Sequence, residues 1–180
     1  QYDTNEPTKR KKSKQPQAPQ QWQLNLALEA ADLKSYDAMP LLITWLGQMQ
    51  LSRKQMGEIF LILTELFNNA LDHGILHLDS AIKAQEDGFD RYLQLRSERL
   101  NELEQGDIFI QLHRISDAEH GECLDIILAD SGSGFGYQAV IDKAQIPLEA
   151  SNNHLSGRGI PLVTTLSQRV HYSDNGRRVE

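Results

Sequence analysis

The sequence predicts an α+β fold, a two-layer sandwich in which helices cover one face of a mixed, mostly antiparallel sheet. First, apolar and polar residues alternate from Trp22 to Leu28, which is the period of a half-buried strand. Second, apolar residues follow helical spacing from Ser52 to Gly74. Third, two neighbouring runs, 108–112 and 123–129, predict a strand hairpin. Strands and helices in this order are typical of α+β proteins.

Three segments of the N-terminal two thirds predict the helical layer. The apolar stretch 41–49 predicts a short helix that is opened by Asp37 and Pro40, since proline is tolerated in a first turn. Ser52 is a favourable N-cap for the long helix that follows. Apolar residues among charges of both signs at 88–104 predict a half-exposed helix with ion pairs.

The C-terminal part predicts one more helix and a second hairpin. The helix is expected at 160–166, and the run 169–172 is followed by a turn at 174–176 and a strand that begins at Arg177. The polar stretch 149–156 lies between two glycine clusters and has no apolar periodicity, which predicts a mobile loop.

Length and composition favour one soluble globular domain. The chain has 180 residues, of which 39% are hydrophobic and 24% are charged. No apolar run approaches the ~18 residues that cross a bilayer, and the polar start is unlike a signal peptide, which excludes a membrane protein. The one cysteine, Cys123, cannot form an internal disulfide and favours a cytoplasmic location.

The first 20 residues differ from the rest in charge. They carry five basic residues against two acidic ones, a net +3, and because the whole chain has −7 the remainder carries −10. Proline and glutamine interrupt the basic run, which predicts a disordered linker over 1–20 rather than a nucleic-acid arm, and a folded domain over 21–180. The acidic domain repels nucleic acid. Because the sequence begins with Gln1, we expect it to be a piece of a longer protein.

The first candidate site lies in the C-terminal half of the long helix. Glu65 and Asn69 are about 40° apart on one face, with Asp72 and His73 beside them, and the apolar residues lie opposite. Taken alone, this face is also what the solvent side of an amphipathic helix presents. Zinc is a further alternative because His73 and His77 have i, i+4 spacing, but the intervening glutamate of the metalloprotease helix is missing.

The second candidate site is the run Asp-Ser-Gly-Ser-Gly-Phe-Gly at 130–136, directly after an apolar strand. It is not the dinucleotide-binding fingerprint, because Tyr137 stands where the third glycine is expected. A glycine-rich turn after a strand is most often only a turn. Asp130, however, is a carboxylate at the end of a buried strand, which needs a donor and could accept one from the exocyclic amine of a base.

The third candidate site is Ser-Gly-Arg-Gly-Ile at 156–160, at the start of the last predicted helix. Glycines at a helix N-terminus let backbone amides approach a phosphate, and Arg158 adds positive charge. Alone this is a weak indication of an anion site. The three runs together, in this order, are far more specific.

Together these runs resemble the motifs of the GHKL or Bergerat ATP-binding domain, which is shared by DNA gyrase, heat-shock chaperones, histidine kinases and mismatch-repair ATPases. Residues 65–74 resemble its N box, 130–134 its first glycine box and 157–160 its second, and the likeness covers about residues 22–180. The form Glu-Leu-x-x-Asn-Ala-x-x-His-Gly is similar to that of bacterial anti-sigma-factor serine kinases. The long segment 75–106 resembles the variant found at the C-terminus of response regulators that carry a phosphatase domain.

The resemblance implies a role for each matching residue. It assigns Glu65 as the general base, Asn69 as the ligand of Mg²⁺ that bridges the ATP phosphates, and Asp130 as the acceptor for the adenine amino group. It implies a lid over the phosphates at 137–156. Relatives commonly place Gly-Thr-Thr in the final strand, where this chain has Gly-Arg-Arg at 176–178. The residues expected to bind the nucleotide are Asn69, Asp72, His73, Asp130, Gly132, Gly134, Gly157, Arg158 and Gly159.

By the same resemblance we expect an ATP- and Mg²⁺-dependent serine kinase. Its substrate would be a small antagonist of an anti-sigma factor, of the sulfate-transporter and anti-sigma-antagonist (STAS) type, in a partner switch that controls a sigma or anti-sigma factor. Receiver and phosphatase domains would precede it, and it could form a homodimer. The alternative is a nucleotide-gated protein-binding module without kinase activity. A histidine kinase catalytic domain is disfavoured because no two-helix dimerisation segment with a phosphoaccepting histidine is present.

Overall fold

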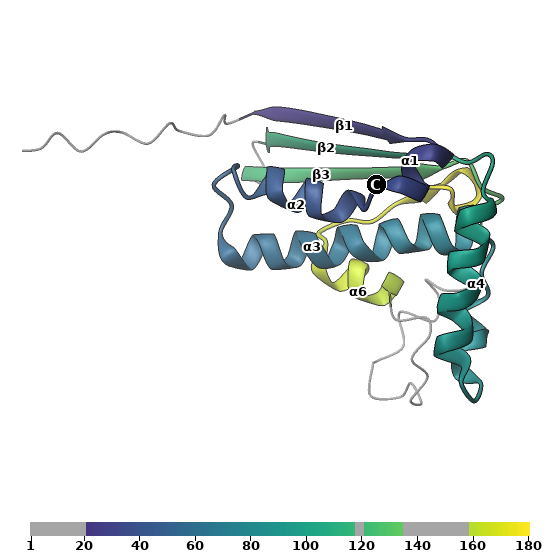
Figure 1. Cartoon of the computed structure of the whole chain (residues 1–180). Coiled ribbons are helices and arrows are strands. Elements are labelled where there is room, and N and C mark those ends of the chain that lie inside the picture. The colour runs from purple at the N-terminus through teal and green to yellow at the C-terminus, as the bar shows by residue number, and fades with distance from the viewer. Residues whose placement is uncertain (1–20, 118–120, 135–158) are drawn as a thin grey trace, which may run out of the picture.

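The computed structural model describes residues 21–117, 121–134 and 159–180. In these ranges the chain forms one layer of strands and one layer of helices (Figure 1). The structure therefore confirms the predicted α+β sandwich. The linker that was predicted over residues 1–20 lies outside the described residues.

The sheet has five strands in the order β1-β2-β3-β5-β4. They are β1 (Trp22–Leu28), β2 (Ile108–Asp117), β3 (Gly121–Asp130), β4 (Tyr172–Ser173) and β5 (Arg178–Val179). All pairings between the described strands are antiparallel. Both predicted hairpins are confirmed, although β4 is shorter than the predicted run at 169–172 and begins at its last residue.

The register of the sheet aligns the apolar side chains of neighbouring strands. Leu26 pairs with Ile110, and Ile110 pairs in turn with Leu128. Because side chains alternate between the two faces of a strand, this register gathers the apolar residues on one face of the sheet. Ile108, Ile110 and Leu112 on that face are at most 1% exposed.

The helices begin at caps that the sequence provides. Ser52 and Gln55 form a capping box at the start of the long helix, in which each side chain accepts a hydrogen bond from the other residue's backbone N–H. Asp37 caps the preceding helix by accepting from the N–H of Met39. The helices are α1 (Ala30–Ser35), α2 (Ala38–Leu46), α3 (Arg53–Asn68), the π-helical η1 (Asn69–Ile75), the 3₁₀-helical η2 (Ser80–Ala84), α4 (Gly88–Glu102), α6 (Gly159–Leu166) and the 3₁₀-helical η4 (Asp174–Gly176).

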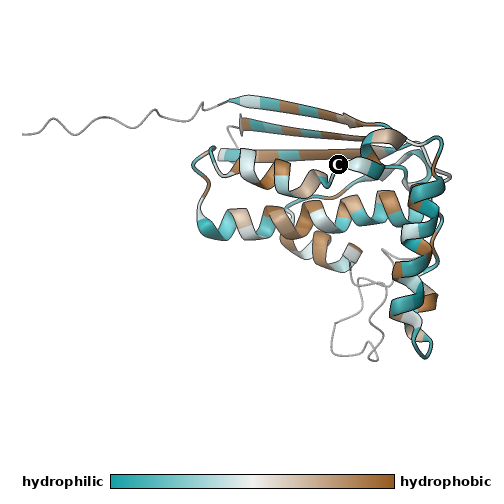
Figure 2. Ribbon diagram, in the orientation of Figure 1, coloured by the Kyte–Doolittle hydropathy of each residue, from teal (hydrophilic) through white to brown (hydrophobic). Residues whose placement is uncertain are grey.

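One apolar core fills the space between the layers. Leu42 of α2 and Leu63 of α3 are at most 1% exposed, and the rings of Trp22 and Trp45 meet edge to face at 4.7 Å. Figure 2 shows much apolar brown along α2, α3 and α6, whereas α4 is mostly teal. Accordingly α4 stands at one end of the sandwich rather than under the sheet (Figure 1). No described helix combines the length and apolar character that crossing a membrane requires.

Two helices were predicted incompletely and one was missed. The short α1 has only six residues, too few to show helical periodicity. The helix α2 begins after Asp37 as predicted, but it ends at Leu46 rather than at Met49. The long helix does not stay α-helical to Gly74 but changes to π-helical winding at Asn69. Such turns occur frequently at functional sites.

Truncating Leu63 to alanine tests the core between the layers. Because Leu63 is 0% exposed, we expect Leu63→Ala to lower the free energy of unfolding by about 2–5 kcal/mol. The control is Leu61→Ala on the same helix, where the side chain is 40% exposed and a loss within about 0.5 kcal/mol is expected. Urea unfolding measures both, and equal losses would contradict the packing described here.

Candidate functional site

Glu65 and Asn69 lie on the side of α3 that meets the start of α6. The apolar stripe of α3 packs into the core, which leaves both polar side chains half-buried. The N–H of Asn69 donates to the carbonyl of Glu65, so the two residues stand one turn apart. A Cβ atom added to Gly159, the first residue of α6, would lie 3.3 Å from Glu65 Cδ and 3.7 Å from Asn69 Nδ2. Three predicted site residues therefore meet where α6 begins.

The side-chain amide of Asn69 has hydrogen-bonding capacity to spare. Its Nδ2 is buried and has no hydrogen-bond partner among the described residues. Buried polar groups are normally paired, so an unpaired one in a native structure needs an explanation, and a bound group is one that fits this position. An asparagine amide offers an oxygen of the kind that Mg²⁺ prefers and an N–H donor for a phosphate oxygen. The residues at this point thus fit a magnesium-bound nucleotide.

Asp130 is the last residue of β3, and the backbone around it fixes its position. Its Oδ1 accepts from the N–H of Gly132 at 2.9 Å, and its own N–H donates to the carbonyl of Arg177 at 2.9 Å. Burial raises the pKa of the Asp130 carboxyl, against the opposing effects of the Gly132 N–H and of the Arg177 charge. In the described parts of the chain no cationic side chain forms an ion pair with this carboxylate. It therefore keeps acceptor capacity for a donor from outside.

Two glycines allow η1 to touch the end of β3. A Cβ atom added to Gly74 would lie 2.5 Å from Asp130 Oδ1 and 2.8 Å from Asp130 Cγ. A Cβ atom added to Gly132 would collide with the carbonyl oxygen of Gly74. A side chain at either position would push the two segments apart. The runs 65–74 and 130–134 are therefore in direct contact.

The turn that precedes β5 packs against the other glycine of this box. Asn175 Nδ2 donates to the carbonyl of Ser133 at 3.2 Å. Gly134 has a φ of +76°, which favours glycine, and a Cβ atom there would collide with the carbonyl oxygen of Asn175. Arg177 forms an ion pair with Asp174 within the same turn. The sequence predicted the turn but not its contact with the glycine box, because the two are far apart along the chain.

Asp72, which was predicted to bind the nucleotide, uses both of its carboxylate oxygens for hydrogen bonds within the protein. It is 6% exposed, its Oδ1 accepts from Arg96 Nε at 2.7 Å, and its Oδ2 accepts from the hydroxyl of Tyr92 at 2.9 Å. Both partners belong to α4. The prediction assumed α-helical spacing, but the π-helical winding that begins at Asn69 changes the direction of the side chains that follow.

The two histidines of this segment differ in their surroundings. His73 Nδ1 donates to the carbonyl of Leu78 at 2.7 Å, so this ring holds the chain after the π-helical turn. His77 Nδ1 lies 3.5 Å from Ser133 Oγ, and a charge on this ring lowers the pKa of Asp130. The sequence analysis did not place His77 near the first glycine box. Within the described ranges, no group of three or more His, Cys, Asp or Glu side chains is arranged to hold a metal ion.

Part of the predicted site lies outside the described residues. Gly157, Arg158 and the lid expected at 137–156 belong to this part. Gly159 alone represents the second glycine box among the described residues, and it lies against Glu65 and Asn69.

A comparison with known protein families identifies the family of this chain. The model of a family described as the histidine kinase-like ATPase domain matches residues 30–180. This range includes the end of α3, the turn after β3 and the start of α6, which are the three parts of the candidate site. No match was found among curated proteins.

Adding a methyl group at Gly132 tests the contact between η1 and the turn after β3. The collision is with backbone, which cannot rotate away, so we expect Gly132→Ala to destabilise the fold by about 1–3 kcal/mol. The control is Gly57→Ala in α3, where nothing lies within 4 Å of the added atom and helix propensity predicts a gain of up to about 1 kcal/mol. The urea midpoints of both variants measure the effect, and a neutral Gly132→Ala would contradict the close contact.

The raised pKa of Asp130 predicts a pH dependence of stability. A carboxyl whose pKa is higher in the folded than in the unfolded state favours folding when protonated, and this contribution is lost as pH rises through the folded pKa. The free energy of unfolding of Asp130→Asn minus that of wild type should therefore be larger at pH 7 than at pH 3.5. At pH 7 the wild type carries a partly buried negative charge that the variant lacks. Urea unfolding at both pH values measures the difference. The same relative stability at both values would show that burial does not disfavour the ionised carboxylate.

Proposed function

Because the chain belongs to the histidine kinase-like ATPase domain family, we propose that it binds ATP with Mg²⁺ and transfers the γ-phosphoryl group to a protein serine. The proposed substrate is a small anti-sigma-factor antagonist of the STAS type. The observation that carries the proposal is the convergence of three motifs, with Gly159 against Glu65 and Asn69, and Gly74 and Gly132 against Asp130. Motifs that are far apart in sequence meet at one end of α3.

Asp130 is proposed to recognise the adenine base. Its carboxylate is fixed by the Gly132 N–H and has no cationic partner in the described residues. A carboxylate is acceptor-only when ionised, so it discriminates in favour of a ring that presents an amino donor. The glycines beside it allow the ligand to approach the backbone closely. This arrangement favours adenine over a base that presents a carbonyl oxygen at the same place.

Asn69 is proposed to hold the magnesium ion and Arg158 to contact the phosphates. The side-chain oxygen of Asn69 is of the kind that Mg²⁺ prefers, and its buried Nδ2, which has no partner among the described residues, can donate to a phosphate oxygen. Bound Mg²⁺ would neutralise part of the phosphate charge, which an acidic domain with a net charge of −10 requires. The start of α6 adds backbone N–H groups and the positive end of a helix dipole, which suit an anion.

Glu65 is proposed to act as the general base. In the transfer, the seryl oxygen bonds to the γ-phosphorus while the bond from this phosphorus to the bridging oxygen of ADP breaks. Glu65 accepts the hydroxyl proton, and ADP leaves. The position of the Glu65 carboxylate supports this role, since it lies one helical turn from Asn69 and against the first residue of α6.

The choice of a serine kinase over other ATP-dependent domains rests on sequence. The run from Glu65 to Gly74 is similar to the form found in anti-sigma-factor kinases, and the segment 75–106 is similar to the one in response regulators with a phosphatase domain. A nucleotide-gated binding module would share every contact described above except a catalytic use of Glu65. A substitution of Glu65 therefore distinguishes the kinase from the binding module.

Substituting Glu65 tests catalysis apart from binding. We expect Glu65→Gln to keep the affinity for Mg²⁺-ATP within about tenfold but to lower phosphate transfer to the antagonist by about 10²- to 10⁴-fold. Asn69→Ala should lose both, because it removes the metal ligand. Calorimetry measures the affinity, and labelled ATP with candidate antagonists measures the transfer.

The control is Glu58→Gln, the same substitution earlier on α3, where the carboxylate forms an exposed ion pair with Lys54 at 3.7 Å. It should leave binding and transfer unchanged. If the wild type binds ATP and an antagonist but transfers no phosphate under single-turnover conditions, the kinase proposal is wrong and the binding module is the better account. If the wild type binds no ATP, the nucleotide site itself is wrong.

A further inference from the structure

Asp72 is a buried carboxylate that joins the π-helical turn η1 to α4. Its two oxygens are both used: Oδ1 accepts from Arg96 Nε at 2.7 Å and Oδ2 from the hydroxyl of Tyr92 at 2.9 Å. The side chains of Asp72 and Arg96 are 8% and 31% exposed, respectively. An ion pair this far from solvent is costly to form and costly to break, because removal of one partner leaves a buried charge without compensation.

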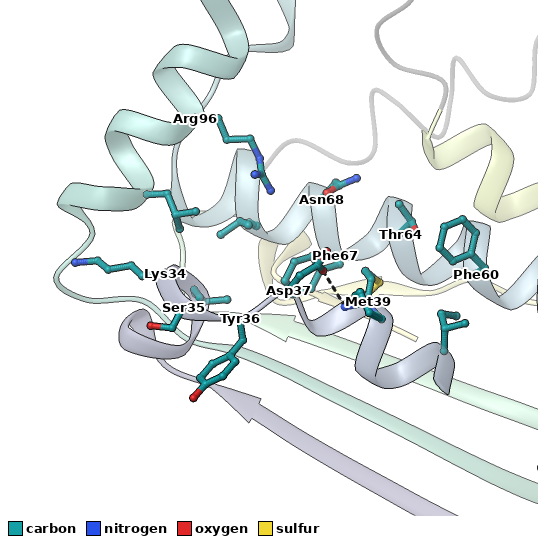
Figure 3. A pocket seen from close by; sticks show the side chains of 15 residues that line it. Lys34, Ser35, Tyr36, Asp37, Met39, Phe60, Thr64, Phe67, Asn68 and Arg96 are labelled. Atoms are coloured by element: carbon teal, nitrogen blue, oxygen red, sulfur yellow. Dashed lines mark hydrogen bonds between the residues drawn. The ribbon is translucent and has the colours of Figure 1, made fainter. Parts of the chain in front are cut away.

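The donor groups on α4 are fixed by their own surroundings. The Lys83 ammonium lies 3.9 Å from the centre of the Tyr92 ring, on its face. Burial and the nearby Asp72 charge raise the pKa of the Tyr92 hydroxyl, so Tyr92 remains a donor at neutral pH. Arg96 borders a cavity of about 610 Å³ that is lined mainly by residues of α1, α2 and α3, and Figure 3 shows its side chain reaching from α4 towards the C-terminal half of α3.

The same helix also holds the residues that follow η1. Arg99 Nη1 donates to the carbonyls of Leu76 and His77, each at 2.7 Å. The N–H of Leu78 donates back to the carbonyl of Asp72 at 2.7 Å. Side chains of α4 and a backbone hydrogen bond within the segment thus hold residues 72–78 in place. Gly74, which touches Asp130, lies inside this held segment.

We propose that Asp72 is a positioning residue for the nucleotide site, which acts through its contacts with Arg96 and Tyr92 to keep η1 in the winding that sets Gly74 against Asp130 and Asn69 beside Gly159. The inference rests on the proposed function, because it assigns Asp72 an effect on nucleotide affinity without contact to the nucleotide. It replaces the earlier expectation that Asp72 binds the nucleotide directly. It also gives α4 a function, since three of its side chains hold the segment on which the site depends.

The test compares Asp72→Asn with a control that breaks an ion pair elsewhere. The control is Arg114→Met, which removes a 2.6 Å ion pair with Glu122 between β2 and β3. Both variants lose a charged partner, but only Asp72 holds η1. At a temperature where circular dichroism shows each variant folded, we expect Asp72→Asn to weaken Mg²⁺-ATP binding at least about tenfold, as for residues that orient a metal ligand. Arg114→Met should bind within about twofold of wild type, because it is remote from the site.

Three further measurements extend the test, and those on Tyr92→Phe keep it decisive if Asp72→Asn folds poorly. Tyr92→Phe removes one hydroxyl group and should weaken Mg²⁺-ATP binding by about threefold, the order of one lost hydrogen bond. Amide exchange without nucleotide should be faster over residues 72–78 in Tyr92→Phe and Asp72→Asn than in Arg114→Met. A double-mutant cycle of Asp72→Asn with Arg96→Gln should be non-additive in nucleotide affinity, because the pair acts as one unit.

The possible results separate this inference from the proposed function. If the wild type binds Mg²⁺-ATP and Asp72→Asn binds it within twofold, the positioning role is wrong and the proposed function stands. If Arg114→Met loses as much affinity as Asp72→Asn, the effect belongs to general stability and the positioning role is again wrong. If the wild type does not bind Mg²⁺-ATP, the proposed function fails, and with it this inference. Loss of affinity in Asp72→Asn and Tyr92→Phe but not in Arg114→Met supports the positioning role.

Discussion

The close contact between Gly74 and the end of β3 is the constraint on which the rest of the site depends. Gly74 belongs to the helical layer, while Asp130 and Gly132 belong to the sheet, so the contact exists only when the two layers pack at one separation. That separation is set by the apolar core between them, in which Leu63 is 0% exposed. Stability and site geometry are therefore not independent here, since a change in core volume alters the gap in which Asp130 stands.

Much of the fold was predictable because its signals are local. The alternation in β1, the Ser52 cap of α3 and the turn at Asp174–Gly176 can each be recognised within a few residues, and the structure confirms all of them. The short α1 was missed because six residues give no periodicity. The residue types of the site were also predictable, since Glu65, Asn69 and Gly159 occur in recognisable runs, and the structure brings these three together.

Two features of the site depended on information that no local pattern contains. The change from α- to π-helical winding at Asn69 arises from what the following residues contact, and a periodicity argument assumes that the winding is uniform. For that reason Asp72 was predicted beside Glu65, whereas its partners Tyr92 and Arg96 come from α4. The i, i+4 spacing of Tyr92 and Arg96 marks one face of α4, but sequence spacing alone does not indicate which buried acid that face meets.

The two acids near the site, Asp72 buried and Asp130 half-buried, differ in how their charges are compensated. Asp72 has a guanidinium and a hydroxyl within hydrogen-bond distance, so its charge is compensated inside the protein. Asp130 has one backbone N–H and no ion pair among the described residues, and burial raises its pKa. An uncompensated buried charge costs folding free energy, and sites that bind a ligand are where such a cost is found. A donor supplied by a ligand would offset the cost at Asp130, whereas at Asp72 both oxygens already have donors. The compensation of each charge, rather than its place in the sequence motif, is therefore the reason why we propose that Asp130 meets the ligand and that Asp72 belongs to the scaffold.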